Sequence, residues 1–206
     1  EIKNRGYIKV STNAEFEPFE YKDGDQIVGI DVDIAKKIAE SLGVPTQIND
    51  VSFDAVTLEL SSGSCDLAIA AMSYSNDKAA NVDFSDTYYF AKQAILVPEN
   101  SPITSGEHLH GKKLGVALGF TGDSYCTENF SDSEIFRYNK SSDAVLDLIN
   151  GRVDAVVVDD APAKKLVRLS GNKVKMLDEY LFEEGYRIAV PKGSTELLDY
   201  INLMLK

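Results

Sequence analysis

The most constraining feature of this chain is a short segment that occurs twice. DAVTLELSSGSCDLAIAAMS, at residues 54–73, is matched by DAVLDLINGRVDAVVVDDAP, at residues 143–162. Each copy has the pattern of an amphipathic helix that stops at a glycine and is followed by an apolar strand. A repeated helix–turn–strand unit predicts two similar lobes, and two facing lobes indicate that something is held between them.

The order of the predicted elements favours an α/β fold with a parallel sheet in each lobe. In the first half we expect strands at 7–12, 46–50 and 66–72. One helix would begin at Asp31 or Asp33 and end at Gly43, and a second would begin at Asp54 and end at Gly63. The second half repeats this scheme, with strands at 112–118, 134–139 and 154–160 and helices at 121–130 and 143–151. Such alternation places a ligand crevice beyond the carboxyl ends of the strands.

A second, shorter repeat predicts where the chain passes between the lobes. AILVPENS, at residues 94–101, resembles RIAVPKGS, at residues 187–194, and each reads as a strand that a proline and a turn end. We therefore expect a discontinuous arrangement with a hinge made of two crossover strands. Lobe one would comprise residues 1–92 and 188–206, lobe two residues 93–187, and the hinge would lie near 92–97 and 187–190.

Composition excludes several classes of partner. The formal net charge of −12 argues against nucleic acid and against an anionic membrane surface, because both would repel the chain. No apolar stretch approaches the roughly 20 residues that a membrane helix needs. The chain begins at Glu1 without a signal-like segment, so we expect that a secretion signal or lipid-anchor segment was removed or not included.

The residues most often involved in redox or metal chemistry are few. Cys65 and Cys126 fall in different predicted lobes and in apolar surroundings, so we expect two buried thiols and no disulfide. His108 and His110 lack further ligands at a metal-site spacing, and neither falls in the predicted cleft. No nucleophile elbow, phosphate-binding loop or catalytic triad is evident, so we expect neither a cofactor nor a catalytic residue.

In several longer motifs the chain resembles the extracytoplasmic solute-binding proteins of amino-acid ABC transporters. These proteins form the polar amino acid-binding family, which has the type II periplasmic-binding fold. The motifs follow the order of the family: FEPFEYKDGDQIVGIDVDIAKKIAESLGV, SFDAVTLELSSGSCDLAIAAMSYS, VDFSDTYYF, LHGKKLGVALGFTGDSY and NGRVDAVVVDD.

The resemblance implies a monomer of two lobes, each a mostly parallel sheet flanked by helices. It also implies that a small-molecule amino acid binds between the lobes and is delivered to an ABC permease. The expected location is extracytoplasmic, either periplasmic or lipid-anchored at a Gram-positive cell surface.

The resemblance also implies a set of ligand-binding residues. They are Asn13, Phe16, Phe53, Ala71, Met72, Ser73 and Lys78 in lobe one, and Phe120, Thr121 and Asp159 in lobe two. An α-amino acid presents a carboxylate beside an ammonium, so its receptor needs positive donors and a carboxylate at a fixed separation. Ser73, Lys78 and Thr121 would bind the carboxylate of the ligand, and Asp159 would bind its ammonium.

Several of these residues have a plain structural alternative. Lys78 stands where the family normally has arginine, and a lysine cannot reproduce a bidentate grip; the alternative is a solvated residue of a turn. Thr121 can cap the helix that follows it, Asp160 can cap the helix after Asp159, and Phe53 can belong to the core.

The aromatic residues Phe16 and Phe53 would lie along the side chain of the ligand. Asn13 and Val158 stand where acidic or polar residues could be, so the pocket is expected to favour a neutral side chain. An amide, a thioether and an apolar side chain all remain open.

Two other functions fit the same fold. One is the ligand-sensing extracellular domain of a membrane signalling protein. The other is an enzyme similar to cyclohexadienyl dehydratases, because fold alone does not exclude catalysis.

Overall fold

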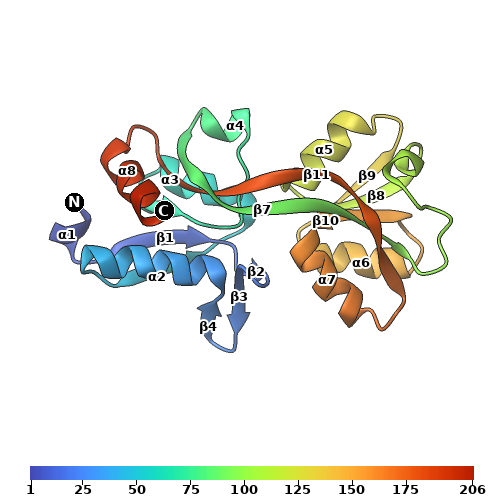
Figure 1. Ribbon diagram of the computed structural model, residues 1–206, viewed down its shortest axis with the longest axis horizontal. Coiled ribbons are helices and arrows are strands. Elements are labelled where there is room, and N and C mark those ends of the chain that lie inside the picture. The colour runs from blue at the N-terminus through green and yellow to red at the C-terminus, as the bar shows by residue number, and fades with distance from the viewer. The chain divides into compact units, whose positions relative to one another are not determined.

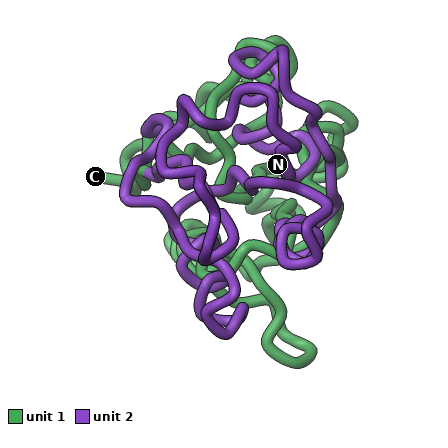
Figure 2. Tube along the Cα trace, turned by 90° about the vertical axis from the view of Figure 1, so that its right-hand side faces the viewer, with its two compact units in different colours: residues 1–90, 185–206 green, residues 91–184 purple.

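Two long strands connect two compact units. In the computed structural model, which describes residues 1–206, β7 (Val82–Pro98) and β11 (Val174–Pro191) each run from one unit into the other. Unit 1 comprises Glu1–Phe90 and Gly185–Lys206, and unit 2 comprises Ala91–Glu184 (Figure 2). The predicted passages lay after residues 92 and 187, whereas the chain leaves unit 1 after Phe90 and returns at Gly185.

Unit 1 is built on a mainly parallel sheet. β1 (Ile8–Thr12) lies between β5 (Thr46–Asp50) and β6 (Leu67–Ala68), parallel to both, and β11 adds to β6 in the antiparallel direction. A separate three-stranded antiparallel sheet contains β2 (Glu15–Phe16), β3 (Glu20–Asp23) and β4 (Gln26–Val28). The helices of this unit are α1 (Ile2–Arg5), α2 (Ile30–Leu42), η1 (Phe53–Ala55), α3 (Val56–Ser61), α4 (Asn76–Ala79) and α8 (Thr195–Met204).

Unit 2 repeats the parallel arrangement. β8 (Lys113–Ala117) lies between β9 (Glu134–Tyr138) and β10 (Ala155–Asp159), parallel to both, and β7 pairs with β10 in the antiparallel direction. The helices are η2 (Gly106–Leu109), α5 (Thr121–Asn129), α6 (Ser141–Ile149) and α7 (Asp160–Leu169). Figure 1 shows α5 on one side of this sheet and α6 with α7 on the other. The expectation of a two-lobed α/β fold is therefore confirmed.

Apolar side chains cover both faces of each sheet. In β6 and the segment after it, Leu67 and Ile69 join one buried cluster, and Ala68 and Ala70 join another. Successive strand residues point to opposite faces, so the two clusters lie on opposite sides of the unit 1 sheet. Burial on both faces explains why this segment reads as a continuous apolar run.

The repeated segment makes the same backbone contacts in both units. The Asp66 carboxylate accepts a hydrogen bond from the Lys9 backbone N–H at 2.7 Å, and the Asp154 carboxylate accepts one from Lys113 N–H at 2.8 Å. The backbone N–H groups of the two aspartates donate in turn to the carbonyl oxygens of the same lysines. Each aspartate thus ties the turn before the third strand of its unit to the first residues of the strand beside it.

The cysteines are separate and buried, as predicted. Cys65 lies in unit 1 and Cys126 in unit 2, and both are free thiols. Burial, aided by neighbouring acidic groups, raises the pKa of each thiol to about 12. Both therefore remain protonated and act as small apolar side chains.

Three local predictions were wrong. The strand predicted at 66–72 is limited to Leu67–Ala68, because the chain turns at Ala71, which has a φ of 44°. Gly29, not Asp31 or Asp33, is the N-cap of α2. The sheet of β2, β3 and β4 was missed, because its short strands lie in a segment that reads as a polar loop.

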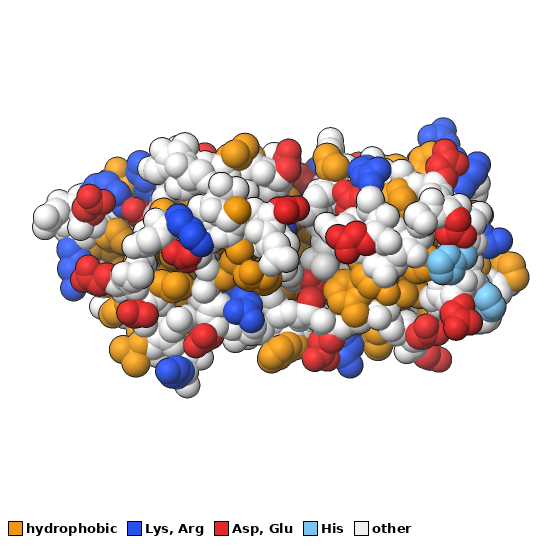
Figure 3. All heavy atoms as spheres, turned by 90° about the horizontal axis from the view of Figure 1, so that it is seen from above, with side chains coloured by type: hydrophobic (Ala, Val, Ile, Leu, Met, Phe, Trp, Pro, Cys, Tyr) orange, Lys and Arg blue, Asp and Glu red, His pale blue; other side chains and the backbone are white.

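The surface is charged and mixed. On the face displayed in Figure 3, acidic and basic side chains are interspersed, and the two histidines lie at the surface. None of the helices combines the length and the apolar character that a membrane crossing requires.

Candidate functional site

In unit 1 a buried carboxylate holds the loop that follows β6. The Ala71 N–H donates to Asp31 Oδ2 at 2.7 Å, and Asp31 is fully buried in the first turn of α2. Ala71 is one of two non-glycine residues with positive φ, a conformation that costs about 1–2 kcal/mol and occurs often at functional sites. The contact with Asp31 fixes the direction in which Met72 and Ser73 leave this turn.

Asp31 also accepts hydrogen bonds from neighbouring side chains. Tyr88 Oη lies 2.9 Å from both carboxylate oxygens, and Glu20 is a further hydrogen-bond partner. Burial raises the pKa of Asp31, although the contacts with Glu20, Ala71 and Tyr88 lower it in part. Burial and the Asp31 charge also raise the pKa of Tyr88 well above its ordinary value. The cluster of Asp31, Glu20 and Tyr88 therefore holds the loop after β6 through the hydrogen bond from Ala71 N–H to Asp31.

The structure brings Phe53 and Lys78 together. Lys78 lies in the short helix α4, which Ser75 caps by accepting a hydrogen bond from the Lys78 N–H at 3.3 Å. The Lys78 ammonium lies 5.1 Å from the centroid of the Phe53 ring, within the range of a cation–π contact. Lys78 is half-buried rather than fully solvated, so it is not simply an exposed residue of a turn.

The predicted residues near Lys78 are more deeply placed. Ser73 is buried and forms an isolated antiparallel bridge with Tyr186 of β11, and the Met72 carbonyl accepts the Arg187 N–H at 2.8 Å. Met72 lies in the core cluster with Ala68 and Ala70, so its side chain packs inside unit 1.

Phe16 and Asn13 lie near the start of the second sheet of unit 1. Phe16 belongs to an aromatic cluster, with its ring centroid 6.1 Å from that of Phe19 and 6.5 Å from that of Tyr186. Asn13 follows β1 and donates from Nδ2 to the Val51 carbonyl at 2.8 Å. Phe16 thus has a packing role in addition to the predicted ligand role.

In unit 2 the start of α5 differs from the prediction. Phe120 is the N-cap residue, and its carbonyl accepts the N–H groups of Asp123 and Ser124. Thr121 is the first helical residue, so its hydroxyl does not cap the helix. The first turn of a helix leaves N–H groups without intrahelical partners, and these groups with the helix dipole favour an anion.

The residue at the N-cap position of α7 is Asp159, not Asp160 as the sequence suggested. Asp159 ends β10 and occupies the N-cap position of α7, whereas Asp160 is the first helical residue. Asp160 accepts the Lys92 N–H at 3.2 Å and forms an ion pair with Lys164 at 3.0 Å. Asp160 is therefore a structural residue, but it is not the cap.

Asp159 lies in a buried polar network. Gln93 Nε2 donates to Asp159 Oδ1 at 2.5 Å and also to Glu184 Oε1. The sequence reasoning missed Gln93 and Glu184. A polar residue inside the apolar run AKQAILV was a usable signal for Gln93, whereas no local pattern distinguishes Glu184 from other acidic residues.

The predicted residues thus form one group in each unit. Asn13, Phe16, Phe53, Ala71, Met72, Ser73 and Lys78 belong to unit 1, and Phe120, Thr121 and Asp159 belong to unit 2. In both units the key groups follow the third parallel strand: Ser73 and Lys78 follow β6, and Asp159 ends β10.

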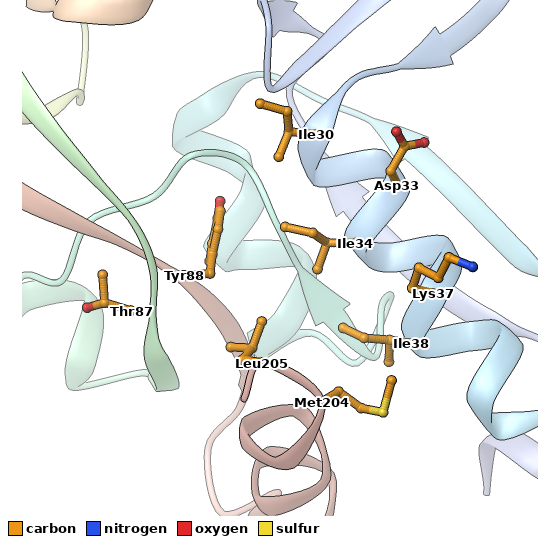
Figure 4. Close-up of a pocket in the computed structure, with 9 residues that line it drawn as sticks. All are labelled: Ile30, Asp33, Ile34, Lys37, Ile38, Thr87, Tyr88, Met204 and Leu205. Atoms are coloured by element: carbon orange, nitrogen blue, oxygen red, sulfur yellow. The ribbon is translucent and has the colours of Figure 1, made fainter.

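A separate cavity of about 520 Å³ lies in unit 1 (Figure 4). Its walls come from α2, β7 and the end of α8, and none of the predicted ligand residues lines it. The lining residues are Ile30, Asp33, Ile34, Lys37, Ile38, Thr87, Tyr88, Met204 and Leu205.

Comparison with known proteins identifies the family. Residues 8–206 match the family model described as bacterial extracellular solute-binding proteins, family 3. The chain belongs to this family. This membership confirms the resemblance seen in the sequence motifs of this family 3 solute-binding protein.

Several relatives match this chain over most of its length. The arginine-binding extracellular protein ArtP of Bacillus subtilis (strain 168) is 34% identical over 202 residues, which cover 96% of this solute-binding protein and 78% of ArtP. The arginine-bound Gly52Ala mutant of ArgBP from T. maritima superposes with a TM-score of 0.92 and 39% identity, covering 99% of this chain and 96% of that one. An ancestral amino acid-binding protein, AncCDT-1, described as a precursor of cyclohexadienyl dehydratase, has a TM-score of 0.90 and 32% identity, with coverage of 99% and 90%.

Proposed function

We propose that this family 3 solute-binding protein binds an L-α-amino acid, with Lys78 and Ser73 of unit 1 on the ligand carboxylate and Asp159 of unit 2 on its ammonium. The observation that carries the proposal is the placement of Asp159, a carboxylate only 4% exposed at the carboxyl end of β10, where its Oδ1 accepts a hydrogen bond from the uncharged amide of Gln93. Parallel α/β sheets bind ligands at this end of the strands.

The relatives support the ligand class. ArtP and the T. maritima protein are named for arginine, and other relatives are named for cystine and histidine. All of these ligands share the α-amino and α-carboxylate groups. The side chain of the ligand is a separate question, and Asn13 favours a neutral one.

Membership of the family supports a wider role. The protein would work outside the cytoplasm as a monomer and deliver its ligand to the permease of an ABC transporter, without catalysis. The strands β7 and β11, which pass between the units after Phe90 and after Glu184, would form the hinge on which the units close around the ligand.

A calorimetric and thermal-shift screen against the twenty amino acids and cystine tests the proposal. A ligand that binds only the folded state stabilises it by about 2.7 kcal/mol at a hundredfold excess over Kd, so one or a few L-amino acids should raise the melting temperature. The D-enantiomers serve as controls. The absence of a shift across the whole panel would refute the proposed ligand class.

The likeness to AncCDT-1 makes dehydratase activity a second candidate. Incubation with prephenate or arogenate should leave both compounds unchanged if the protein only binds its ligand. An aromatic product that depends on the protein would establish the enzyme instead.

A further inference from the structure

We propose that Glu184 is a second carboxylate of the ammonium-binding position at Asp159, and that Gln93 is the positioning residue that holds the two carboxylates together. This inference rests on the proposed function, because it assigns a further residue to the same binding site.

The two carboxylates converge on one nitrogen atom. Gln93 in β7 lies directly opposite Asp159 in the antiparallel pair with β10, and residues paired in this way project from the same face of a sheet. Its Nε2 donates to Asp159 Oδ1 and to Glu184 Oε1. An amide NH₂ has two hydrogens, so Gln93 gives one to each carboxylate.

The burial of this network determines which ligand group fits it. The exposed fractions are 0% for Gln93, 4% for Asp159 and 9% for Glu184. The Gln93 amide brings an oxygen of each carboxylate to the same nitrogen atom, so the two acceptor groups lie close together. A cation with several N–H donors is the chemical complement, and an α-ammonium offers three such donors.

The orientation of Gln93 is fixed by its neighbours. Its Oε1 is buried and accepts no hydrogen bond, so the two donated bonds alone orient the amide. The amide packs against the first turn of α5, where a methyl group added to Gly122 would lie 3.1 Å from Gln93 Oε1 and 3.1 Å from the Val157 carbonyl oxygen. The absence of a side chain at Gly122 leaves room for the amide between α5 and β10.

A role on the α-ammonium has a specific consequence. Every L-α-amino acid carries this group, so the loss of the Glu184 charge should weaken all such ligands by a similar factor. The same loss should not affect an analogue that lacks the α-amino group. A merely structural role would weaken both compounds equally.

Titration calorimetry with Glu184→Gln makes this comparison. The probes are L-arginine with 5-guanidinopentanoate, and L-glutamine with 4-carbamoylbutanoate; each second compound is the first without its α-amino group. We expect about tenfold or more weaker binding of the amino acids, equivalent to at least about 1.4 kcal/mol, and unchanged binding of the analogues. Glu183→Gln is the matched control, because it removes the same charge from the exposed neighbouring residue, and it should change nothing.

Gln93→Met provides a second variant, with a side chain of similar size but without the two N–H donors. It should also weaken the binding of the amino acids while leaving the binding of the analogues unchanged. Equal losses for amino acid and analogue, or no loss in either variant, would overturn the assignment of Glu184. A loss confined to L-arginine would also overturn it, since that result places Glu184 on the ligand side chain. If the wild-type protein bound none of the twenty amino acids and cystine, the proposed function itself would be contradicted. That result differs from every outcome that overturns only the assignment of Glu184.

Discussion

Lys78 stands at the position where the sequence resemblance implies an arginine. Its ammonium is a point charge with rotatable donors, and the nearby Phe53 ring, 5.1 Å away, restricts where that charge can lie.

Substitution of Lys78 tests its role on the ligand carboxylate. Lys78→Ala should cost about 2–5 kcal/mol of binding free energy, as expected for a truncated ionic contact, whereas Lys78→Arg should retain binding or strengthen it. Lys36→Ala, at an exposed lysine of α2, is the matched control. If calorimetry gave equal affinities for the wild type and Lys78→Ala, Lys78 would not bind the ligand carboxylate.

Asp31 gives the stability of the protein a predictable dependence on pH. Burial raises its pKa above the ordinary 3.8, so the folded state holds this proton more tightly than the unfolded state does. The resulting stabilisation is complete below pH 3.8 and is lost as the pH rises through the folded-state pKa of Asp31. Glu20 and Tyr88 are the titratable groups that face it.

Urea unfolding of the wild type and Asp31→Asn, measured from about pH 3 to about pH 8, checks this dependence. The free energy of unfolding of the wild type should fall relative to that of the variant as the pH rises, because the asparagine side chain has no proton to lose. Asp33→Asn, on the exposed side of the same helix, should follow the wild type. Parallel curves for the wild type and Asp31→Asn would show that Asp31 keeps its ordinary pKa.

At the level of elements, the repeated segment predicted the two helix–turn–strand units because its glycine and aspartate have fixed structural tasks. Gly63 and Gly151 both adopt a φ of 72°, and each aspartate binds the backbone of the strand next to its own. A short local pattern was sufficient because the helix, the glycine turn and the strand of each copy follow one another directly in the sequence.

Removal of the two aspartates should therefore destabilise the protein to different degrees. Asp66 is half-buried and also forms an ion pair with Arg5, whereas Asp154 is exposed. We expect Asp66→Ala to cost about 1–3 kcal/mol of unfolding free energy and Asp154→Ala to cost less, as measured by chemical denaturation. A larger loss for Asp154→Ala would contradict this account of the repeat.

The errors at this level arise from contacts that a local pattern does not contain. The strand predicted at 7–12 is β1, observed one residue shorter, because its apolar alternation specifies a strand; the strand predicted at 46–50 is β5. The strand after Gly63 was predicted too long, because nothing local shows that Ala71 turns to donate to Asp31. Gln93 and Glu184 were missed for the same reason: they meet only through the register of separate strands.

For the whole molecule, the predicted ligand residues fall in both units, and the proposed binding of one ligand to both groups predicts a change of shape. Lys78 and Ser73 belong to unit 1, whereas Thr121 and Asp159 belong to unit 2. Under the proposal, the units close on one small molecule that contacts both groups, and the two connecting strands absorb the rotation.

Small-angle scattering should detect this closure. The radius of gyration should decrease when a bound L-amino acid saturates the protein. Asp159→Asn should weaken both binding and compaction, because it removes the partner of the ammonium. Identical scattering curves with and without a ligand that calorimetry shows to be bound would contradict hinge closure.

The central claim is that one amino acid contacts both units, and intermolecular nuclear Overhauser effects test it most directly. With isotope-labelled protein and an unlabelled bound L-amino acid, we predict contacts from the ligand protons to the Phe53 ring of unit 1 and to the Thr121 methyl group of unit 2. Contacts confined to residues of a single unit would contradict the claim.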